Sequence, residues 1–372
     1  MFRIRQISLF QFKNYTNRSF DFRERIVGIC GNNGMGKTNL LDAIHYLCFT
    51  RSYFTRQDGN SVKQGCSGFR LEGACRLNEQ PEKAVCVLRE NGRKEFSVNE
   101  EAYVKFSRHI GRYPCVVIAP DDAELITGDS RVRRTFLDEL LSQLDPVYLQ
   151  ELIRYTRVLQ QRNSLLKNFA ETNRRDDALL DVLDEQLLAP GEMIFNKRRE
   201  FLLEFLPAVN LLYQEIARQP EAGASAKTFL PQEPVNLVYD SELLQASFRE
   251  LLKANRQRDC LSQRSSSGIH RDDLEILLGN QPFKSIASQG QRKSLLFALK
   301  LAEMERLKEE KGFAPLLLLD DVFEKLDEER IGNLLRKVCI ENEGQVFITD
   351  THQERLNVHL KALAVEFQLI QL

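Results

Sequence analysis

The pattern of apolar and polar residues predicts strands at the start of the chain. The segments FRIRQISLFQF and RSFDF flank the turn-like KNYTN, and a continuous apolar run, Ile26 to Cys30, follows them. The alternation in the first segment is imperfect, so the pattern leaves its register open. We interpret residues 2–30 as an antiparallel opening that ends in a core strand.

Short β-like runs separated by turn signals continue between residues 51 and 117. The runs FRLEGACRL and KAVCVLRE come first, and Asn91-Gly92 then separates KAVCVLRE from RKEFSVN. Because Asn-Gly between such runs favours a turn that joins two strands, we predict a hairpin there. A further strand, YPCVVIAP, ends at Pro120.

After Pro120 the apolar residues recur at helical spacing as far as Ala217. The segment 218–236 is rich in Pro and Gly and predicts an irregular connection, and a further helix is expected from Ser241 to Asp259. We therefore predict a mostly helical lobe at residues 120–265. It is inserted into a first lobe formed by residues 1–119 and 266–372.

A phosphate-binding loop follows the apolar run that ends at Cys30. The pattern G-x-x-x-x-G-K-[ST] is met by Gly31, Asn32, Asn33, Gly34, Met35, Gly36, Lys37 and Thr38. Its glycines let backbone N–H groups turn toward phosphate oxygens, and the helix that follows adds its positive N-terminal dipole. A plain glycine-rich turn is the alternative, but the flanking strand and helix favour a nucleotide site. Lys37 is expected to reach the β- and γ-phosphates, and Thr38 to bind Mg²⁺.

The segment PLLLLDD, residues 315–321, completes the predicted site with two carboxylates at the end of a buried strand. We expect Asp320 to hold Mg²⁺ and its water shell, and Asp321 to orient and deprotonate the attacking water. The plainer interpretation is a buried strand that merely ends in a turn. The phosphate-binding loop upstream disfavours that interpretation.

A second short motif lies between the two nucleotide motifs. Ser288, Gln289, Gly290 and Gln291 precede the amphipathic segment KSLLFALKLAEMERL. Alone, this tetrapeptide indicates only a helix N-cap. Its order relative to the other motifs, however, resembles that of ABC-type ATPase heads, in which the S-x-G-Q element of one subunit closes over the γ-phosphate held by the other. The sequence thus predicts an α/β protein, with an ABC/SMC-type P-loop ATPase lobe of mixed sheet and helices and an inserted helical lobe.

Composition narrows the class of protein. Hydrophobic residues make up 42% of the chain and charged residues 28%, which is typical of a soluble globular protein. No apolar run approaches the roughly 20 residues that span a bilayer, and the first residues lack the features of a signal peptide. The eight cysteines form no C-x-x-C pair, and several lie in apolar runs. We expect free, buried thiols and a cytoplasmic protein without membrane contact.

The net charge of −1 requires that any nucleic-acid surface arise from local segregation of charge. Basic clusters occur at 131–134, 197–199 and 253–264. Charge runs usually mark solvated helix faces, whereas contact with duplex phosphates is the functional alternative. The sequence alone leaves both interpretations open.

The chain closely resembles the RecF family, the bacterial recombinational-repair ATPases of the SMC/ABC superfamily, over essentially its whole length. The similarity lies in ISLFQFKNYTN, GNNGMGKTNLLDAI, IAPDDAELITGDSRVRRTFLD, GIHRDD, SQGQRKSLLFALKLAE, LLLDDVFEKLD and QVFIT. By this resemblance Gly31 to Thr38 form the Walker A loop and Ser288 to Gln291 the signature. Asp320 and Asp321 form Walker B, and Leu326-Asp327 the D-loop at the dimer seam.

The resemblance also implies partners and an activity. It implies an ATP-dependent homodimer that clamps double-stranded DNA at gaps or single/double-strand junctions. It also implies weak, DNA-stimulated hydrolysis of ATP to ADP and phosphate, which releases the clamp. A RecR-type mediator would join the protein to promote RecA loading during DNA replication, repair and the SOS response to DNA damage. The sequence names neither the DNA-contacting residues nor the surface that meets RecR.

A few positions depart from the family pattern. Glu324 occupies a D-loop position that usually carries a small residue, and Ile269 replaces a usual proline in GIHRDD. Asp321 replaces the glutamate that is common in ABC ATPases, and its shorter side chain predicts slow turnover. The switch residue after the last core strand remains open among Thr349, Asp350, Thr351 and His352.

Three other functions agree less well with these motifs. The nucleotide-binding subunit of a transporter normally carries a glutamate after Walker B, and its opening strands would not match RecF. A P-loop kinase lacks an S-x-G-Q helix between its nucleotide motifs. A DNA-binding scaffold without hydrolysis is disfavoured because Lys37, Thr38 and Asp320 are all present.

Overall fold

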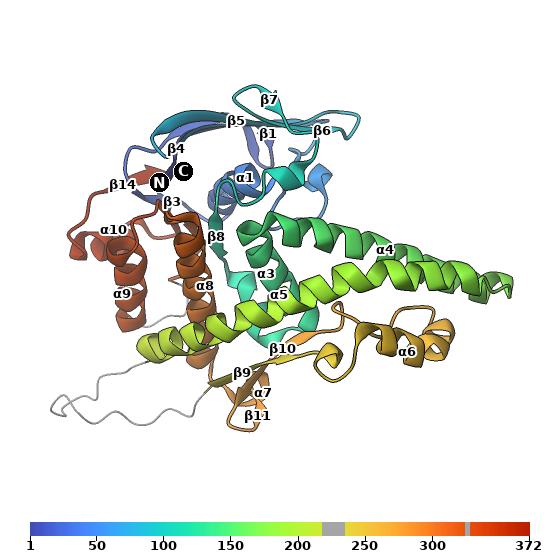
Figure 1. Ribbon diagram of the computed structural model, residues 1–372. Coiled ribbons are helices and arrows are strands. Elements are labelled where there is room, and N and C mark those ends of the chain that lie inside the picture. The colour runs from blue at the N-terminus through green and yellow to red at the C-terminus, as the bar shows by residue number, and fades with distance from the viewer. Residues whose placement is uncertain (218–234, 324–327) are drawn as a thin grey trace. The chain divides into compact units, whose positions relative to one another are not determined.

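The computed structural model describes residues 1–217, 235–323 and 328–372. The chain forms two compact units: unit 1 consists of Met1–Asp122 and Phe297–Leu372, and unit 2 of Ala123–Leu296 (Figure 1). Residues 266–296, which we expected in the ATPase lobe, thus belong to unit 2. The reason is a strand pairing, because β10 (Asp273–Leu278) is antiparallel to β9 (Val235–Asp240).

Unit 1 contains a parallel sheet of buried, apolar strands. The strand order is β14 (Phe367–Gln371), β3 (Ile26–Cys30), β13 (Val346–Asp350), β12 (Leu316–Leu319) and β8 (Cys115–Ile118). Every residue of β3, β13, β12 and β8 is buried, as expected for a parallel sheet covered on both faces. Parallel pairing brings the carboxyl ends of these strands to one edge, where ligands of open α/β sheets bind.

The second sheet of unit 1 is antiparallel. Its strand order is β2 (Tyr15–Asp21), β1 (Phe2–Phe12), β4 (Phe69–Leu77), β5 (Gln80–Leu88), β6 (Lys94–Val98) and β7 (Glu101–Ala102). The hairpin at Asn91-Gly92 is confirmed, because Leu88 pairs with Lys94 across it. The imperfect alternation in β1 also has a physical cause. The pairing with β4 shifts register between Ile4 and Gln6, so a bulge changes which side chains face the core.

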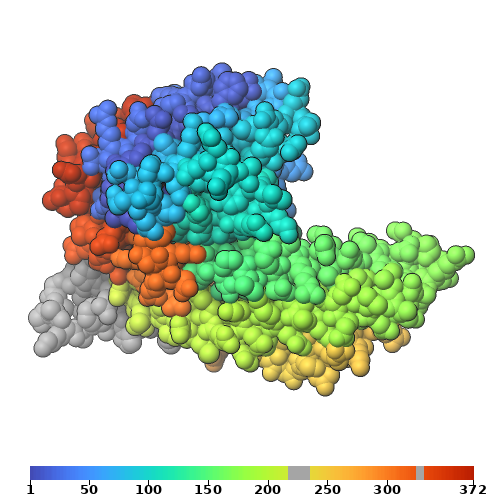
Figure 2. All heavy atoms as spheres, turned by 45° about the horizontal axis from the view of Figure 1, so that its top comes forward, coloured from blue at the N-terminus to red at the C-terminus, as the bar shows by residue number. Residues whose placement is uncertain are grey.

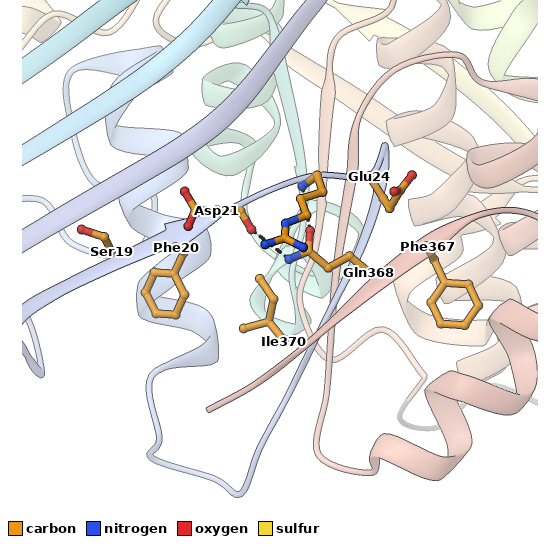
Figure 3. A pocket seen from close by; sticks show the side chains of 8 residues that line it. Ser19, Phe20, Asp21, Glu24, Phe367, Gln368 and Ile370 are labelled. Carbon is orange, nitrogen blue, oxygen red and sulfur yellow. Dashed lines mark hydrogen bonds between the residues drawn. The ribbon is translucent and has the colours of Figure 1, made fainter.

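The antiparallel interpretation of residues 2–30 was right for β1 and β2 but wrong for β3. β3 lies between β14 and β13 and pairs in parallel with both. The C-terminal strand is also tied to the segment before β3, where Gln368 Nε2 donates to the Asp21 carbonyl at 2.9 Å and Gln368 Oε1 accepts from Arg23 N at 2.8 Å. These bonds border the open hollow of about 440 Å³ drawn in Figure 3.

The helices of unit 1 pack around the parallel sheet. They are α1 (Lys37–Phe49), the second part of α8 (Gln289–Lys311), α9 (Glu328–Arg336), a π-helical turn (Lys337–Glu341) and α10 (Gln353–Ala362). In α1 the predicted apolar face is buried, and so are Asp42, Ala43, His45 and Tyr46, so this helix is enclosed on all sides. It joins β1, β4 and β8 in one hydrophobic core.

Unit 2 is mostly helical. Its helices are α2 (Glu124–Thr127), α3 (Ser130–Leu144), α4 (Pro146–Thr172), α5 (Asp177–Ala217), α6 (Phe248–Ser262), α7 (Phe283–Ile286) and the start of α8. The long helices α4 and α5 run side by side as an antiparallel pair (Figure 1). A small sheet of β11 (Gln281–Pro282), β10 and β9 accompanies them. The helix predicted from Ser241 begins instead at Phe248, where Ser247 and Glu250 form a capping box.

The connection predicted at 218–236 lies outside the described residues as far as residue 234, and β9 begins at Val235. All eight cysteines are free thiols, and six of them are buried, as the sequence predicted. Within the described ranges, no helix combines the length and the apolar character that crossing a bilayer requires.

The buried ring of His109 predicts acid sensitivity of unit 1. Burial lowers the pKa of His109 to about 4, and its Nε2 lies 2.8 Å from the Leu47 carbonyl. Because the unfolded chain takes up the proton near pH 6.5, this contribution to stability is complete above that pH and is lost as the pH falls toward 4. The free energy of unfolding, measured in urea, decreases between pH 7 and pH 5. This decrease should be about 2 kcal/mol smaller for His109→Gln than for the wild type. The control His352→Gln, at an exposed ring, should behave as the wild type.

Candidate nucleotide-binding site

The loop between β3 and α1 has a backbone that only glycine adopts easily. Gly34 and Gly36 have φ angles of 82° and 109°. At Gly36 the surroundings also exclude a side chain, because a Cβ atom would lie 2.6 Å from Asn14 Nδ2 and 2.8 Å from the Tyr15 hydroxyl. Gly36 is the N-cap of α1, so the helix begins at Lys37 with its free N–H groups at the loop.

The turn between β1 and β2 braces this loop. Asn14 Nδ2 donates to the Met35 carbonyl at 3.0 Å, and the Tyr15 hydroxyl donates to the Gly36 carbonyl at 3.0 Å. Asn39 Nδ2 donates in turn to Asn14 Oδ1 at 2.8 Å. Sequence reasoning treated KNYTN only as a turn and missed this role. Its position within the first family-specific run was the signal that could have pointed to it.

Lys37 folds back over the loop. Its Nζ donates to the Gly31 carbonyl at 2.9 Å and to the Asn32 carbonyl at 3.4 Å, and the side chain is only 4% exposed. These two carbonyl oxygens accept hydrogen bonds from the ammonium, which has three N–H donors, and they do not neutralise its charge. An anion such as a phosphate at this loop would supply that neutralisation.

A shared hydrogen-bond network joins Lys37's neighbour Thr38 to the predicted Walker B strand. The Thr38 hydroxyl donates to Asp320 Oδ2 at 2.8 Å, and the Thr349 hydroxyl donates to Asp320 Oδ1 at 2.7 Å. Burial raises the pKa of Asp320, and the hydrogen bonds from Thr349 and Thr38 oppose that rise by favouring the charged form. The structure thus brings Thr38 of α1 and Asp320, which follows β12, together as predicted.

Thr349 of β13 contacts both aspartates. Its hydroxyl accepts a hydrogen bond from Asp321 N at 2.9 Å while it donates to Asp320. Asp321 has φ of 43°, a left-handed conformation that aspartate tolerates. Thr349 therefore orients the two residues from which the sequence predicts metal binding and water activation.

The other switch candidates lie in different surroundings. Asp350 is buried and forms a bidentate ion pair with Arg355, at 2.8 Å to Nε and 2.6 Å to the terminal nitrogen. His352 is exposed at the N-cap of α10. Among the four candidates, Thr349 is in direct contact with the paired aspartates. The D-loop residues Leu326-Asp327, and Glu324, lie outside the described residues.

The predicted signature lies in unit 2 and forms a capping box at the start of α8. The Gln291 N–H donates to Ser288 Oγ at 3.2 Å, and the Ser288 N–H donates to Gln291 Oε1 at 2.8 Å. Ser288 is exposed, and its Oγ serves as an acceptor in the cap. Its hydroxyl hydrogen therefore remains available to a ligand, as do the N–H groups of Gln289 and Gly290 at the helix start.

The donor set fits both predicted ligands. The hydroxyl of Thr38 and the carboxylate of Asp320 are hard oxygen donors of the kind that Mg²⁺ prefers. The glycine backbone of residues 31–36, the N-terminus of α1 and the ammonium of Lys37 fit a polyphosphate. These groups come from two segments almost three hundred residues apart, since the bond between Thr38 and Asp320 spans 282 positions.

The basic clusters separate into structural and available residues. Arg133 and Arg198 are 9% and 1% exposed and form ion pairs with aspartates of unit 2. On α6, Arg249 and Arg256 are paired with acidic residues of α5. Much of the basic character at 131–134 and 197–199 therefore stabilises unit 2 instead of facing a ligand.

Comparison with known proteins identifies the relatives of this chain. A family model described as an AAA domain matches residues 6–357. The DNA replication and repair protein RecF of Flavobacterium johnsoniae is 41% identical over 99% of this chain and 99% of that protein. RecF of Phocaeicola vulgatus is 38% identical over 98% of this chain and 95% of that protein.

Solved structures agree with these relatives. The recombination mediator protein RecF of the RecFOR pathway, in its RecF-ATPrS form, matches with a TM-score of 0.86 and 28% identity, covering 100% of this chain and 96% of that one. The RecF-ATP form matches with a TM-score of 0.84 and 29% identity, covering 95% and 92%. An Smc head domain from Pyrococcus furiosus, with a TM-score of 0.52 at 16% identity over 96% and 92%, shares the fold. The predicted ABC/SMC-type ATPase fold is thereby confirmed.

Replacing Thr349 tests the network around Asp320. In Thr349→Val the Asp321 N–H and the Asp320 carboxylate both lose a buried partner, so the protein should be destabilised by about 1–3 kcal/mol in urea unfolding. Thr349→Ser keeps the hydroxyl and serves as the control. Equal stability of the two variants would show that the hydroxyl does not hold the two aspartates.

Proposed function

This chain belongs to the RecF family of DNA replication and repair proteins, and from that premise we propose that it is an ATP-dependent DNA-binding protein of recombinational repair. Two copies dimerise when ATP is bound, clamp double-stranded DNA near gaps or single/double-strand junctions, and promote RecA loading with a RecR-type mediator. Slow ATP hydrolysis releases the clamp. The observation that carries the proposal is the Thr38–Asp320–Thr349 network beside a phosphate-binding loop.

Each group of the site has a role in binding ATP. Backbone N–H groups of residues 31–36 and the Lys37 ammonium bind the phosphates, which exchanges the carbonyl partners of Lys37 for anionic oxygens. Thr38 and Asp320 would hold Mg²⁺, which when bound neutralises charge on the phosphate oxygens. The solved RecF-ATP structure supports nucleotide binding by such a site.

Hydrolysis depends on Asp321. Its backbone N–H is fixed by Thr349, so the carboxylate extends from a rigid position beside Asp320. There it orients the attacking water and accepts its proton. Because aspartate is one methylene shorter than glutamate, we propose a slow, weak ATPase suited to a timed clamp. DNA would stimulate it by favouring the dimer.

The second half of the ATP site comes from a second copy of the chain. Ser288 is already fixed as the N-cap of α8, and its hydroxyl hydrogen and the N–H groups that follow suit a γ-phosphate held by the partner. This arrangement makes nucleotide binding and dimerisation one event. The transporter alternative has no comparable support, because the full-length relatives are DNA repair proteins.

The lobe boundaries follow from this proposal. Unit 1 supplies the ATPase site, and unit 2 supplies the signature and the DNA-facing surface. This division shifts the second boundary from residue 266 to the middle of α8, where unit 2 ends. We propose a cytoplasmic location for the protein, where RecA and the chromosome are found.

Duplex binding with and without ATP is the first test. Fluorescence anisotropy of a labelled duplex with a single-stranded gap, at near-physiological salt, should show binding that requires ATP and Mg²⁺. Lys37→Met removes the phosphate-binding charge and should abolish this binding. The control Lys105→Met changes an exposed lysine of unit 1 and should bind as the wild type. Duplex binding that is equal with and without ATP would contradict a nucleotide-gated clamp.

Substitutions at Ser288 test the composite site. Ser288→Asp keeps a good helix N-cap but places a negative charge where the partner's γ-phosphate should lie, so it should bind ATP as a monomer and fail to dimerise. Ser288→Arg should block closure by its bulk. Ser288→Thr preserves both the cap and the hydroxyl and serves as the control. If the Asp and Arg variants dimerise with ATP as the wild type does in light scattering, the composite site is wrong.

A further inference from the structure

The 264–273 loop, which follows α6 and includes the first residue of β10, carries two exposed arginines on a rigid frame. We propose that Arg264 and Arg271 of this 264–273 loop contact the backbone phosphates of the bound duplex. The inference rests on the proposed function, because it assigns residues to the DNA surface of that clamp. No motif of the nucleotide site includes these two residues.

The first half of the loop is held by side chains of α4 and α6. Asn163 Oδ1 accepts from Ser265 N at 2.7 Å, and Asp259 Oδ1 accepts from Ser266 N at 2.9 Å. Arg162 is fully buried and donates to Asp259 Oδ2 at 2.7 Å and to Ser265 Oγ at 2.8 Å. Buried, charge-assisted hydrogen bonds of this kind fix a loop strongly, because breaking them leaves charges without partners.

The second half of the loop is fixed equally well. Gly268 has φ of 120°, and a Cβ atom there would lie 2.6 Å from the Tyr155 hydroxyl. The His270 ring bridges this hydroxyl, at 2.8 Å, and the Ser265 carbonyl, at 3.2 Å, and so connects the two halves. Arg198 donates to the Ile269 carbonyl at 2.8 Å and to Asp272 Oδ2 at 2.9 Å.

The polar side chains of the loop fall into two groups, those with partners inside unit 2 and those that are exposed. Ser265, Ser266, Ser267, His270, Asp272 and Asp273 all have hydrogen-bond or ion-pair partners within unit 2. Arg264 and Arg271 are both exposed, and within the described residues neither side chain has a partner. The loop is therefore built from satisfied polar groups, and the two arginines are left pointing to solvent.

The charge of the loop surface is set by these arginines. Asp259 and Asp272 are buried and Asp273 is half-buried. Each carboxylate is paired with an arginine, Arg162, Arg198 and Arg133 in turn, which offsets its negative charge. The pKa of His270 is lowered to about 4, mainly by burial, and the positive charges of Arg271 and Arg134 act in the same direction. His270 is thus a neutral bridge at physiological pH, beside two guanidinium groups.

A duplex is the ligand that this surface fits. Guanidinium groups bind phosphate oxygens in a bidentate manner, and a fixed backbone reduces the entropy lost when they do so. The adjoining α6 carries two more exposed basic residues, Lys253 and Arg258. Figure 2 shows the gold atoms of α6 beside the green and yellow-green atoms of the α4–α5 pair, with which α6 is in contact.

The test compares two double variants that remove the same charge. Arg264→Ala/Arg271→Ala removes the unpaired arginines. Arg249→Ala/Arg256→Ala removes two arginines of α6 that are already neutralised by Glu185, Asp177 and Asp181. Binding of a labelled duplex is measured by anisotropy with ATP and Mg²⁺ over a series of salt concentrations. The slope of the logarithm of affinity against the logarithm of salt concentration counts the phosphate contacts.

We expect the first variant to bind more weakly and with a slope shallower by about 1.8, since each phosphate contact contributes about 0.9. Arg264→Lys/Arg271→Lys should retain most of the slope, because lysine also neutralises a phosphate. Thermal stability and binding of a fluorescent ATP analogue should be unchanged, since both arginines are exposed and unpaired. The control variant should keep the slope of the wild type.

Three outcomes would overturn the inference. The first is that Arg264→Ala/Arg271→Ala keeps the salt slope of the wild type. The second is that the control variant loses as much duplex affinity as this variant does. The third is that Arg264→Ala/Arg271→Ala also loses ATP binding, which would place the arginines at the nucleotide. Loss of RecR binding with duplex binding intact would likewise assign the loop to a protein partner. If the wild type itself binds no duplex with ATP, the proposed function fails, and that result is distinct from a failure of the loop assignment.

Discussion

The carboxylate of Asp320 is buried at the edge of the parallel sheet, and the nucleotide site depends on how that charge is satisfied. Thr38 reaches it from the first turn of α1, and Thr349 reaches it from β13. A buried carboxylate without such donors would be neutralised or would destabilise the fold. The same three residues therefore fix where the phosphate-binding loop, the Walker B strand and β13 stand relative to one another. The site is preorganised because its metal-binding groups are also the groups that hold unit 1 together at this edge.

In unit 2, buried charges are satisfied by ion pairs between arginine and aspartate. Arg162 and Arg198 are almost fully buried, and each binds two aspartates from different elements. The planar guanidinium suits this role, because it donates several hydrogen bonds in fixed directions. These two side chains connect α3, α4, α5, α6 and the 264–273 loop. The consequence is a rigid lobe in which the basic side chains without an acidic partner lie at defined positions on the surface.

A run of basic residues in a sequence can contain both buried, paired arginines and exposed basic side chains. Lys197, Arg198 and Arg199 are adjacent, yet Arg198 is 1% exposed while its neighbours face solvent. Local sequence contains no information about the partner of a long side chain, since Asp272 lies 74 residues away from Arg198. For the same reason the role of GIHRDD could not be deduced from the sequence. In the structure, five of its six residues hold the loop in place, and the sixth, Arg271, is exposed.

The sequence by itself determined the features that are local. The phosphate-binding loop, the paired aspartates after four leucines, the N-cap at Ser288 and the helical lobe could be proposed from the sequence, because each depends on residues a few positions apart. The tertiary structure alone decided what depends on contacts between distant segments. It placed β3 in the parallel sheet, assigned residues 266–296 to unit 2, and brought Asn14 and Tyr15 to the phosphate-binding loop. It also put Thr349, one of the four switch candidates, in contact with the paired aspartates. Those contacts form only when the chain is folded, so no short-range pattern records them.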